Sequence, residues 1–131
     1  MAKKGPRHPR PSPSGIKTSP PVECHLWRDG NPSMEQLMMA LTPIMTYEEE
    51  SHLIRNVLRC KDCGHLYFHE FTEKIDWREG NDAQYSLWIP VNDLASADKL
   101  NELSTAELSA FYGLHYDFPT EDEKPTGPYW K

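Results

Sequence analysis

The sequence predicts an α+β fold built from a small antiparallel sheet and a few short helices. Two segments rich in aromatic and β-branched residues, 65–77 and 84–91, alternate with a period of two, as strands do. Turn-forming residues separate these segments, which predicts an antiparallel hairpin. Two serines, Ser33 and Ser104, are each followed three residues later by Gln or Glu, a pattern typical of helix N-termini.

The composition predicts one domain preceded by a basic tail. A chain of 131 residues has room for a single domain, which we place at residues 22–131. Residues 1–21 contain six prolines, five basic side chains and no acidic one. Such a segment buries too little apolar area to offset the entropy lost on ordering, so we expect a disordered tail.

The net charge and the distribution of apolar residues limit which partners and which cellular compartment we expect for this protein. Outside residues 1–21 the net charge is −11, against −6 for the whole chain, which disfavours nucleic acid as a partner of the domain. No apolar run is long enough for a transmembrane helix, and none follows the basic N-terminus as in a signal peptide. We therefore expect a cytoplasmic protein without a membrane partner.

The first half of the domain predicts an extended segment, a helix and a strand. Residues 22–27 indicate a short strand or extended segment. Ser33 is the expected N-cap of a short helix, which ends before Thr42 and Pro43. Residues 47–51 suit either a solvated turn or the start of a helix. Residues 52–59 suit a strand or a helical face, and we favour the strand because a strand follows.

The sequence predicts the hairpin formed by residues 65–77 and 84–91 in more detail. The odd positions of 65–77, which end with Trp77, are expected to face inward. Gly80 and Asn81 tolerate a positive φ and indicate a turn. Pro90 cannot donate to a neighbouring strand, so it predicts that the end of the return strand lies at a sheet edge.

Two helices and a returning tail are expected at the C-terminal end. Ser96 is expected to open a helix that runs to Leu103, and Ser104 to open another that ends at Gly113. Their apolar residues should pack on the sheet: Leu100, Leu103, Leu108 and Phe111. The rings of Tyr129 and Trp130 suggest that the tail folds back onto the domain.

Cys60 and Cys63 form the motif with the clearest chemistry. Two cysteines separated by two residues place both sulfurs on one side of a turn, and Gly64 can adopt the left-handed conformation that closes it. The stretch resembles the knuckle of zinc-ribbon and rubredoxin-like proteins over residues 59–71. The resemblance implies a hairpin that carries zinc and implies little about function.

The remaining ligands are less well defined. A zinc ribbon has a second cysteine pair, whereas here only Cys24 remains, and we expect it to be the third ligand of a tetrahedral site. His25 is the preferred fourth ligand, although neighbouring residues on a regular strand face opposite ways. Other candidates are His65, His52 and His69. The alternatives are reduced cysteines without a metal, or a redox pair.

No enzyme signature is complete, so we expect a protein without catalytic residues. The stretch from His69 begins like a zinc-protease helix, but Glu73 stands where the second histidine is required. The expected function is a structural zinc site that supports a protein–protein interaction surface, with Trp88 and Tyr116 as possible anchors. One alternative is an immunity or inhibitor protein that uses its acidic charge to neutralise a basic toxin or nuclease. Another is a nucleic-acid-associated zinc-ribbon protein that uses its basic tail.

Overall fold

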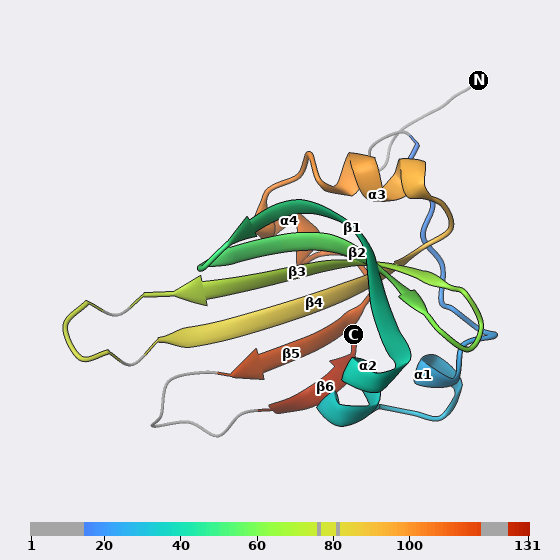
Figure 1. Cartoon of the computed structure of the whole chain (residues 1–131), viewed down its shortest axis with the longest axis horizontal. Helices are drawn as coiled ribbons and strands as arrows, with labels where there is room; N and C mark the ends of the chain where they lie inside the picture. The colour runs from blue at the N-terminus through green and yellow to red at the C-terminus, as the bar shows by residue number, and fades with distance from the viewer. Residues whose placement is uncertain (1–14, 76, 81, 119–125) are drawn as a thin grey trace.

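The computed structural model describes residues 15–75, 77–80, 82–118 and 126–131. They form one antiparallel sheet of six strands whose spatial order is the order of the sequence (Figure 1). The expected α+β class is therefore confirmed. The strands are β1 (Leu41–Glu50), β2 (Leu53–Cys60), β3 (Leu66–Lys74), β4 (Ala83–Val91), β5 (Leu114–Phe118) and β6 (Thr126–Trp130). The helices are α1 (His25–Arg28), α2 (Met34–Ala40), α3 (Leu94–Leu100) and α4 (Thr105–Leu108).

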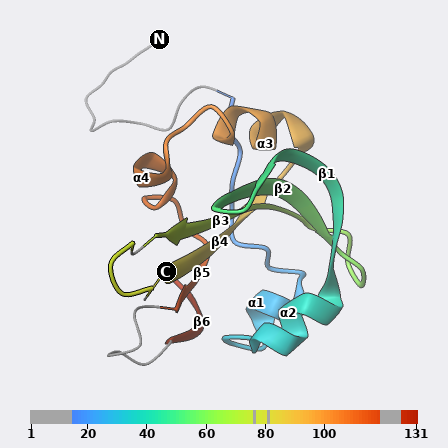
Figure 2. The ribbon, with the colours of Figure 1, turned by 60° about the vertical axis from the view of Figure 1, so that its left-hand side comes forward.

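Short helices cover both faces of the sheet. Figure 2 shows α3 and α4 on one side of the strands and α1 and α2 on the other. Each side has its own buried cluster. One contains Cys24, Leu26, Leu37, Ala40, Leu41, Cys60, Tyr67, Trp88 and Leu114. The other contains Val57, Phe68, Leu87, Ile89, Val91, Ala97, Leu100 and Leu108.

Helices on both faces of the sheet change the expectation for residues 65–77, which was that only one face of this strand points inward. Neighbouring residues of β3 point to opposite faces, yet Tyr67 and Phe68 are both fully buried. Trp77 lies beyond the end of β3 and is 88% exposed, so its expected inward position is wrong. The pattern of the strand was recognisable, but the number of covered faces depends on helices elsewhere in the chain.

The capping boxes of α2 and α4 are confirmed. Ser33 and Gln36 exchange hydrogen bonds at the start of α2, and Ser104 and Glu107 do so at the start of α4. These bonds satisfy backbone N–H groups that a helix leaves without partners. The sequence therefore located both helix starts correctly.

The boundaries of α3 and α4 differ from expectation. Asp93, not Ser96, caps α3, because its carboxylate accepts the Ser96 N–H at 2.8 Å. Helix α4 ends at Leu108 rather than at Gly113. Gly113 instead exchanges two backbone hydrogen bonds with Lys131. A Cβ atom there would lie 2.6 Å from the Trp88 carbonyl oxygen, so glycine allows the close approach.

Two further segments differ in the first half of the chain. Residues 22–27 do not form a strand, since α1 begins at His25 and the Cys24 carbonyl accepts the Trp27 and Arg28 N–H groups. Residues 47–50 form neither a turn nor a helix start, because they belong to β1, which pairs with β2, whereas Ser51 lies in the turn that follows β1. The preferred strand for 52–59 is confirmed by β2.

The turn after β3 and the end of β4 agree with the sequence in part. Gly80 has a φ of +69°, as the turn requires, whereas Asn81 lies outside the described residues. β4 is an interior strand, so the expected sheet edge at Pro90 is wrong for the strand as a whole. β5 pairs with β4 only as far as Trp88, which leaves Pro90 beyond the end of that neighbour.

Both ends of the described chain pack on the domain. Residues 15–21 lie within the expected tail, yet Lys17 N–H donates to Ser96 Oγ at 2.8 Å and the Lys17 carbonyl accepts the Asn92 N–H at 2.9 Å. Residues 1–14 are outside the description. At the other end, Trp130 Nε1–H donates to the Leu26 carbonyl at 3.0 Å, so the expected return of the C-terminal residues is confirmed.

One buried ion pair joins the sheet to the helices on its α3–α4 side. Arg55 of β2 contacts Glu70 of β3, with Nη2 2.8 Å from Oε2. Arg55 Nη1 also donates to the Asn101 carbonyl at 2.9 Å, and Thr105 Oγ1 donates to Glu70 Oε2 at 3.0 Å.

No helix of the described chain has the length and apolar character needed to cross a membrane.

Candidate metal centre

The turn between β2 and β3 positions two of the three cysteines. β2 ends at Cys60, whose carbonyl accepts the Gly64 N–H at 2.8 Å and whose N–H donates to the His65 carbonyl at 2.9 Å. Gly64 has a φ of +81°, the left-handed conformation expected from the motif. The Lys61 N–H donates to the Ala40 carbonyl at 2.8 Å, which ties the turn to the last residue of α2.

Cys24 reaches this turn from the N-terminal side of α1. It is the N-cap residue of that helix, and its N–H donates to the Pro21 carbonyl at 2.8 Å. Its side chain is fully buried and faces the sheet, where the Tyr67 hydroxyl donates to Sγ at 3.0 Å. The helix start thus directs the thiol towards β3.

The three sulfur atoms of Cys24, Cys60 and Cys63 lie within 4.8 Å of one another. Tetrahedral zinc with Zn–S bonds of about 2.3 Å separates two sulfur ligands by about 3.8 Å, close to this arrangement. Cys24 and Cys60 are buried, and Cys63 is exposed. The structure therefore brings the three expected residues together, and this cluster could hold a metal ion.

His25 lies beside the cluster together with a residue that the sequence analysis did not single out. His25, Cys60 and Asp62 each place a ligand atom within 4.8 Å of the others, and His25 Nδ1 is 3.5 Å from Asp62 Oδ2. Cys24 and His25 are at a helix start rather than on a strand, so both reach the same turn; among the described residues, however, His25 shares a group with Cys60 and Asp62 and not with all three cysteines. The position of Asp62 between the two turn cysteines is the sequence feature that could have identified it as a possible ligand.

The other three candidate histidines belong to neither group of possible ligands among the described residues. His65 packs its ring 5.5 Å from that of Tyr67, and burial lowers its pKa. His52 Nδ1 is 3.3 Å from Glu73 Oε1, beyond the opposite end of β2 from Cys60. His69 Nδ1 is 3.0 Å from Asn56 Oδ1.

The surroundings of Cys24 favour a neutral thiol when no cation is near. Burial raises the pKa of Cys24 to about 12, although hydrogen bonds from the Tyr67 hydroxyl and the Leu26 amide act in the opposite direction. Burial also raises the pKa of Tyr67, so its hydroxyl keeps its proton and donates to the sulfur. A nearby cation would reverse the preference at Cys24, since thiolate is the form that binds metal. No local sequence pattern pointed to Tyr67, which is 43 residues from Cys24.

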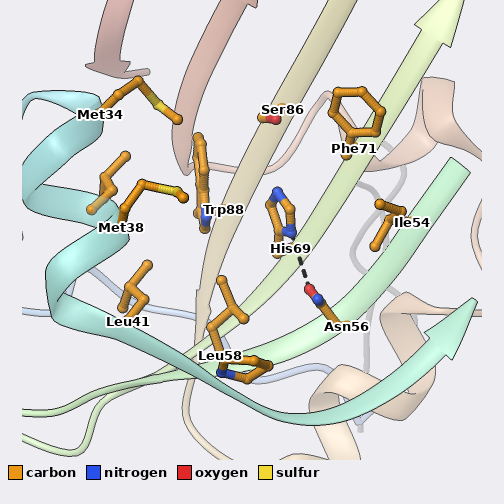
Figure 3. Close-up of a pocket in the computed structure, with 12 residues that line it drawn as sticks. Met34, Met38, Leu41, Ile54, Asn56, Leu58, His69, Phe71, Ser86 and Trp88 are labelled. Carbon is orange, nitrogen blue, oxygen red and sulfur yellow. Dashed lines mark hydrogen bonds between the residues drawn. The ribbon is translucent and has the colours of Figure 1, made fainter. Parts of the chain in front are cut away.

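An apolar groove lies on the same face of the sheet. Its volume is about 460 Å³, and α2 forms one wall while β2, β3 and β4 form the floor (Figure 3). Trp88 is 5% exposed and forms part of this floor, so it is a core residue rather than an exposed anchor. Tyr116 is partly buried against the same cluster.

The geometry thus combines a cysteine cluster with an adjacent groove. Cys24 precedes α1, and the turn that carries Cys60 is bonded to the end of α2. The segment that holds both helices is therefore attached to the cluster near each of its ends.

Comparison of the chain with protein families, with curated proteins and with solved structures finds no match.

Proposed function

We propose that this chain is a non-catalytic binding protein whose structure is completed by a zinc ion. The ligands in this proposal are Cys24, Cys60 and Cys63, with His25 as the fourth. The observation that carries the proposal is the placement of three sulfurs, from segments 36 residues apart, within 4.8 Å of one another.

The donor set favours zinc in a structural role. Three thiolates and one imidazole are ligands that zinc binds tetrahedrally, and four protein ligands leave no open position for water or substrate. Asp62 lies near His25 Nδ1, and carboxylates commonly orient the histidines that bind zinc. The site is then closed, and the ion contributes folding free energy rather than catalysis.

The ion would support the groove through α2. Cys24 lies before α1, and the Lys61–Ala40 backbone hydrogen bond holds the end of α2 against the metal-binding turn. Binding of zinc would fix both ends of the 24–40 segment, and with them the α2 wall of the groove. We therefore assign the groove as the surface at which a protein partner binds.

Metal analysis of the purified, reduced full-length protein tests this proposal. We expect about one zinc per chain by mass spectrometry of the metal content, and a lower melting temperature after a strong chelator is added. Cys63→Ser should lose both the stoichiometric zinc and the effect of the chelator. His65→Gln alters the same turn but no proposed ligand, so it should retain both.

Two results would overturn the proposal. Wild-type protein that carries no stoichiometric ion, and melts at the same temperature with and without the chelator, has no structural metal. Equal zinc content in the Cys63→Ser and wild-type proteins would remove the cysteine cluster as the site.

A further inference from the structure

The groove beside α2 has an apolar and uncharged lining. Among the described residues, its wall and floor contain no lysine, arginine, aspartate or glutamate. The lining residues on which the inference depends are Met38, Asn56, His69, Phe71 and Trp88. A charged group would lose its hydration here without gaining an opposite charge, so the lining selects an uncharged occupant.

His69 places a hydrogen-bond acceptor in the middle of this lining. Its ring stacks on Trp88, with the centroids 4.9 Å apart, and its Nδ1 is 3.0 Å from Asn56 Oδ1. The amide oxygen can only accept, so Nδ1 carries the hydrogen. Burial lowers the pKa of His69 to about 4, and the ring is therefore neutral near pH 7.

The second ring nitrogen of His69 is consequently a free acceptor. Figure 3 shows that it points away from Asn56. No group in the described part of the chain donates a hydrogen bond to it. A partner that supplies a donor inside the groove would satisfy Nε2, whereas a purely aliphatic partner would not.

Few natural side chains meet these conditions. The side chain must be largely apolar, uncharged and large, and it must carry a hydrogen-bond donor. Trp and Tyr combine a broad apolar ring with one N–H or O–H, which is why they anchor protein interfaces. The flat ring of Phe71, which is only partly buried, provides a surface on which such a ring can pack.

The rim of the groove favours a protein segment over a small molecule. Met34 and Met38 both line the groove, and Met38 is 73% exposed. Small-molecule pockets enclose most of the ligand surface, whereas exposed methionines are typical of surfaces that adapt to peptides. Apolar contact can therefore extend along α2 beyond a single ring.

We propose that the groove binds a segment of a protein partner through one Trp or Tyr side chain whose N–H or O–H donates to His69 Nε2. The inference rests on the proposed function, because the zinc ion is what holds the α2 wall in place. It adds the chemical identity of the anchor and the residue that recognises it.

Titration of the zinc-loaded full-length protein with short peptides, followed by NMR chemical shifts, tests this inference. The probe is N-acetyl-Leu-Trp-Leu-amide, and its matched control carries 1-methyltryptophan, which keeps the ring and removes the donor. We expect the methylated peptide to bind wild-type protein at least 5-fold more weakly. His69→Phe keeps an aromatic ring without the acceptor, so the two peptides should bind this variant equally.

Two neighbouring methionines provide matched protein variants. Met38→Glu places a charge in the groove and should weaken binding of the Trp peptide at least 10-fold. Met39→Glu makes the same change at a similarly exposed residue outside the lining, and it should alter binding by less than 2-fold. Because both side chains are exposed, neither variant depends on repacking of the core.

Three results would overturn the inference. The first is absence of binding by the Trp peptide, and the second is equal binding of the two peptides to wild-type protein. The third is binding of free indole as tight as that of the peptide, which would identify a small-molecule site instead. Zinc content measured on the same samples separates the two proposals: zinc-loaded protein that ignores the peptide contradicts only the anchor inference, and zinc-free protein contradicts the metal site.

Discussion

The Tyr67 hydroxyl donates a hydrogen bond to Cys24 Sγ at 3.0 Å. The bond connects the start of β3 to the N-cap residue of α1. Tyr67 is fully buried, so its hydroxyl has no access to bulk water as an alternative partner. The candidate metal centre is therefore part of the core on this face of the sheet.

Replacement of Tyr67 by Phe should weaken zinc binding without removing it. The variant leaves all four proposed ligands and deletes only the donor to Cys24 Sγ. Loss of a partner that orients a ligand lowers metal affinity by about 10-fold or more. Competition with a chromophoric zinc chelator measures the change. Tyr129→Phe removes a hydroxyl that donates to Asp117 instead, and it should bind zinc like wild type; equal affinities for Tyr67→Phe and wild type would contradict the prediction.

Replacement of His25 by Gln should change the geometry of the bound ion. In cobalt-substituted protein we expect the visible absorption bands of tetrahedral cobalt to shift in this variant, because one imidazole ligand is lost. Asp62→Asn should cause a smaller loss of affinity, since it removes only the carboxylate near His25 Nδ1. His65→Gln serves as the control. A spectrum that changes in His65→Gln and not in His25→Gln would assign the fourth ligand to His65.

The buried Arg55–Glu70 pair should stabilise the fold only as a pair. Glu70→Leu leaves the buried Arg55 guanidinium without its carboxylate, which we expect to cost about 3–5 kcal/mol in the free energy of unfolding. The double variant Arg55→Met, Glu70→Leu removes both charges and should recover much of this loss. Urea denaturation measures both variants. A double variant less stable than the single one would show that Arg55 contributes mainly through its bond to the Asn101 carbonyl.

His69 should make the fold less stable in mild acid. Its pKa is about 4 in the folded chain, below the ordinary value of 6.5, so the unfolded chain binds more protons between these pH values. The neutral His69 ring contributes its full stabilisation to the free energy of unfolding above pH 6.5. This contribution decreases as the pH falls, by about 2 kcal/mol between pH 7 and pH 5.

The matched comparison for this effect is His69→Phe. Urea denaturation of both zinc-loaded proteins at pH 7, 6 and 5 should show a stability difference that shifts in favour of the variant as the pH decreases. Protonation of the zinc ligands affects both proteins alike and cancels in the difference. A difference that is constant over this range would mean that His69 titrates normally in the folded chain.

The sequence by itself determined the features that depend on near neighbours. The capping boxes at Ser33 and Ser104 need contacts between residues three apart. The turn at Gly64 and the two-residue period of β3 and β4 are also local, because sterics and hydrogen bonding within a few residues specify them. The Cys60–Cys63 motif was recognisable for the same reason.

Only the tertiary structure decided which distant residues meet. It placed Cys24, expected on a short strand or extended segment, at the start of a helix beside the β2–β3 turn, and it brought Tyr67 to the site. It also covered both faces of the sheet and left a groove next to α2. These outcomes come from the packing of α1–α4 on the strands, and packing joins segments whose separation in sequence carries no local signal.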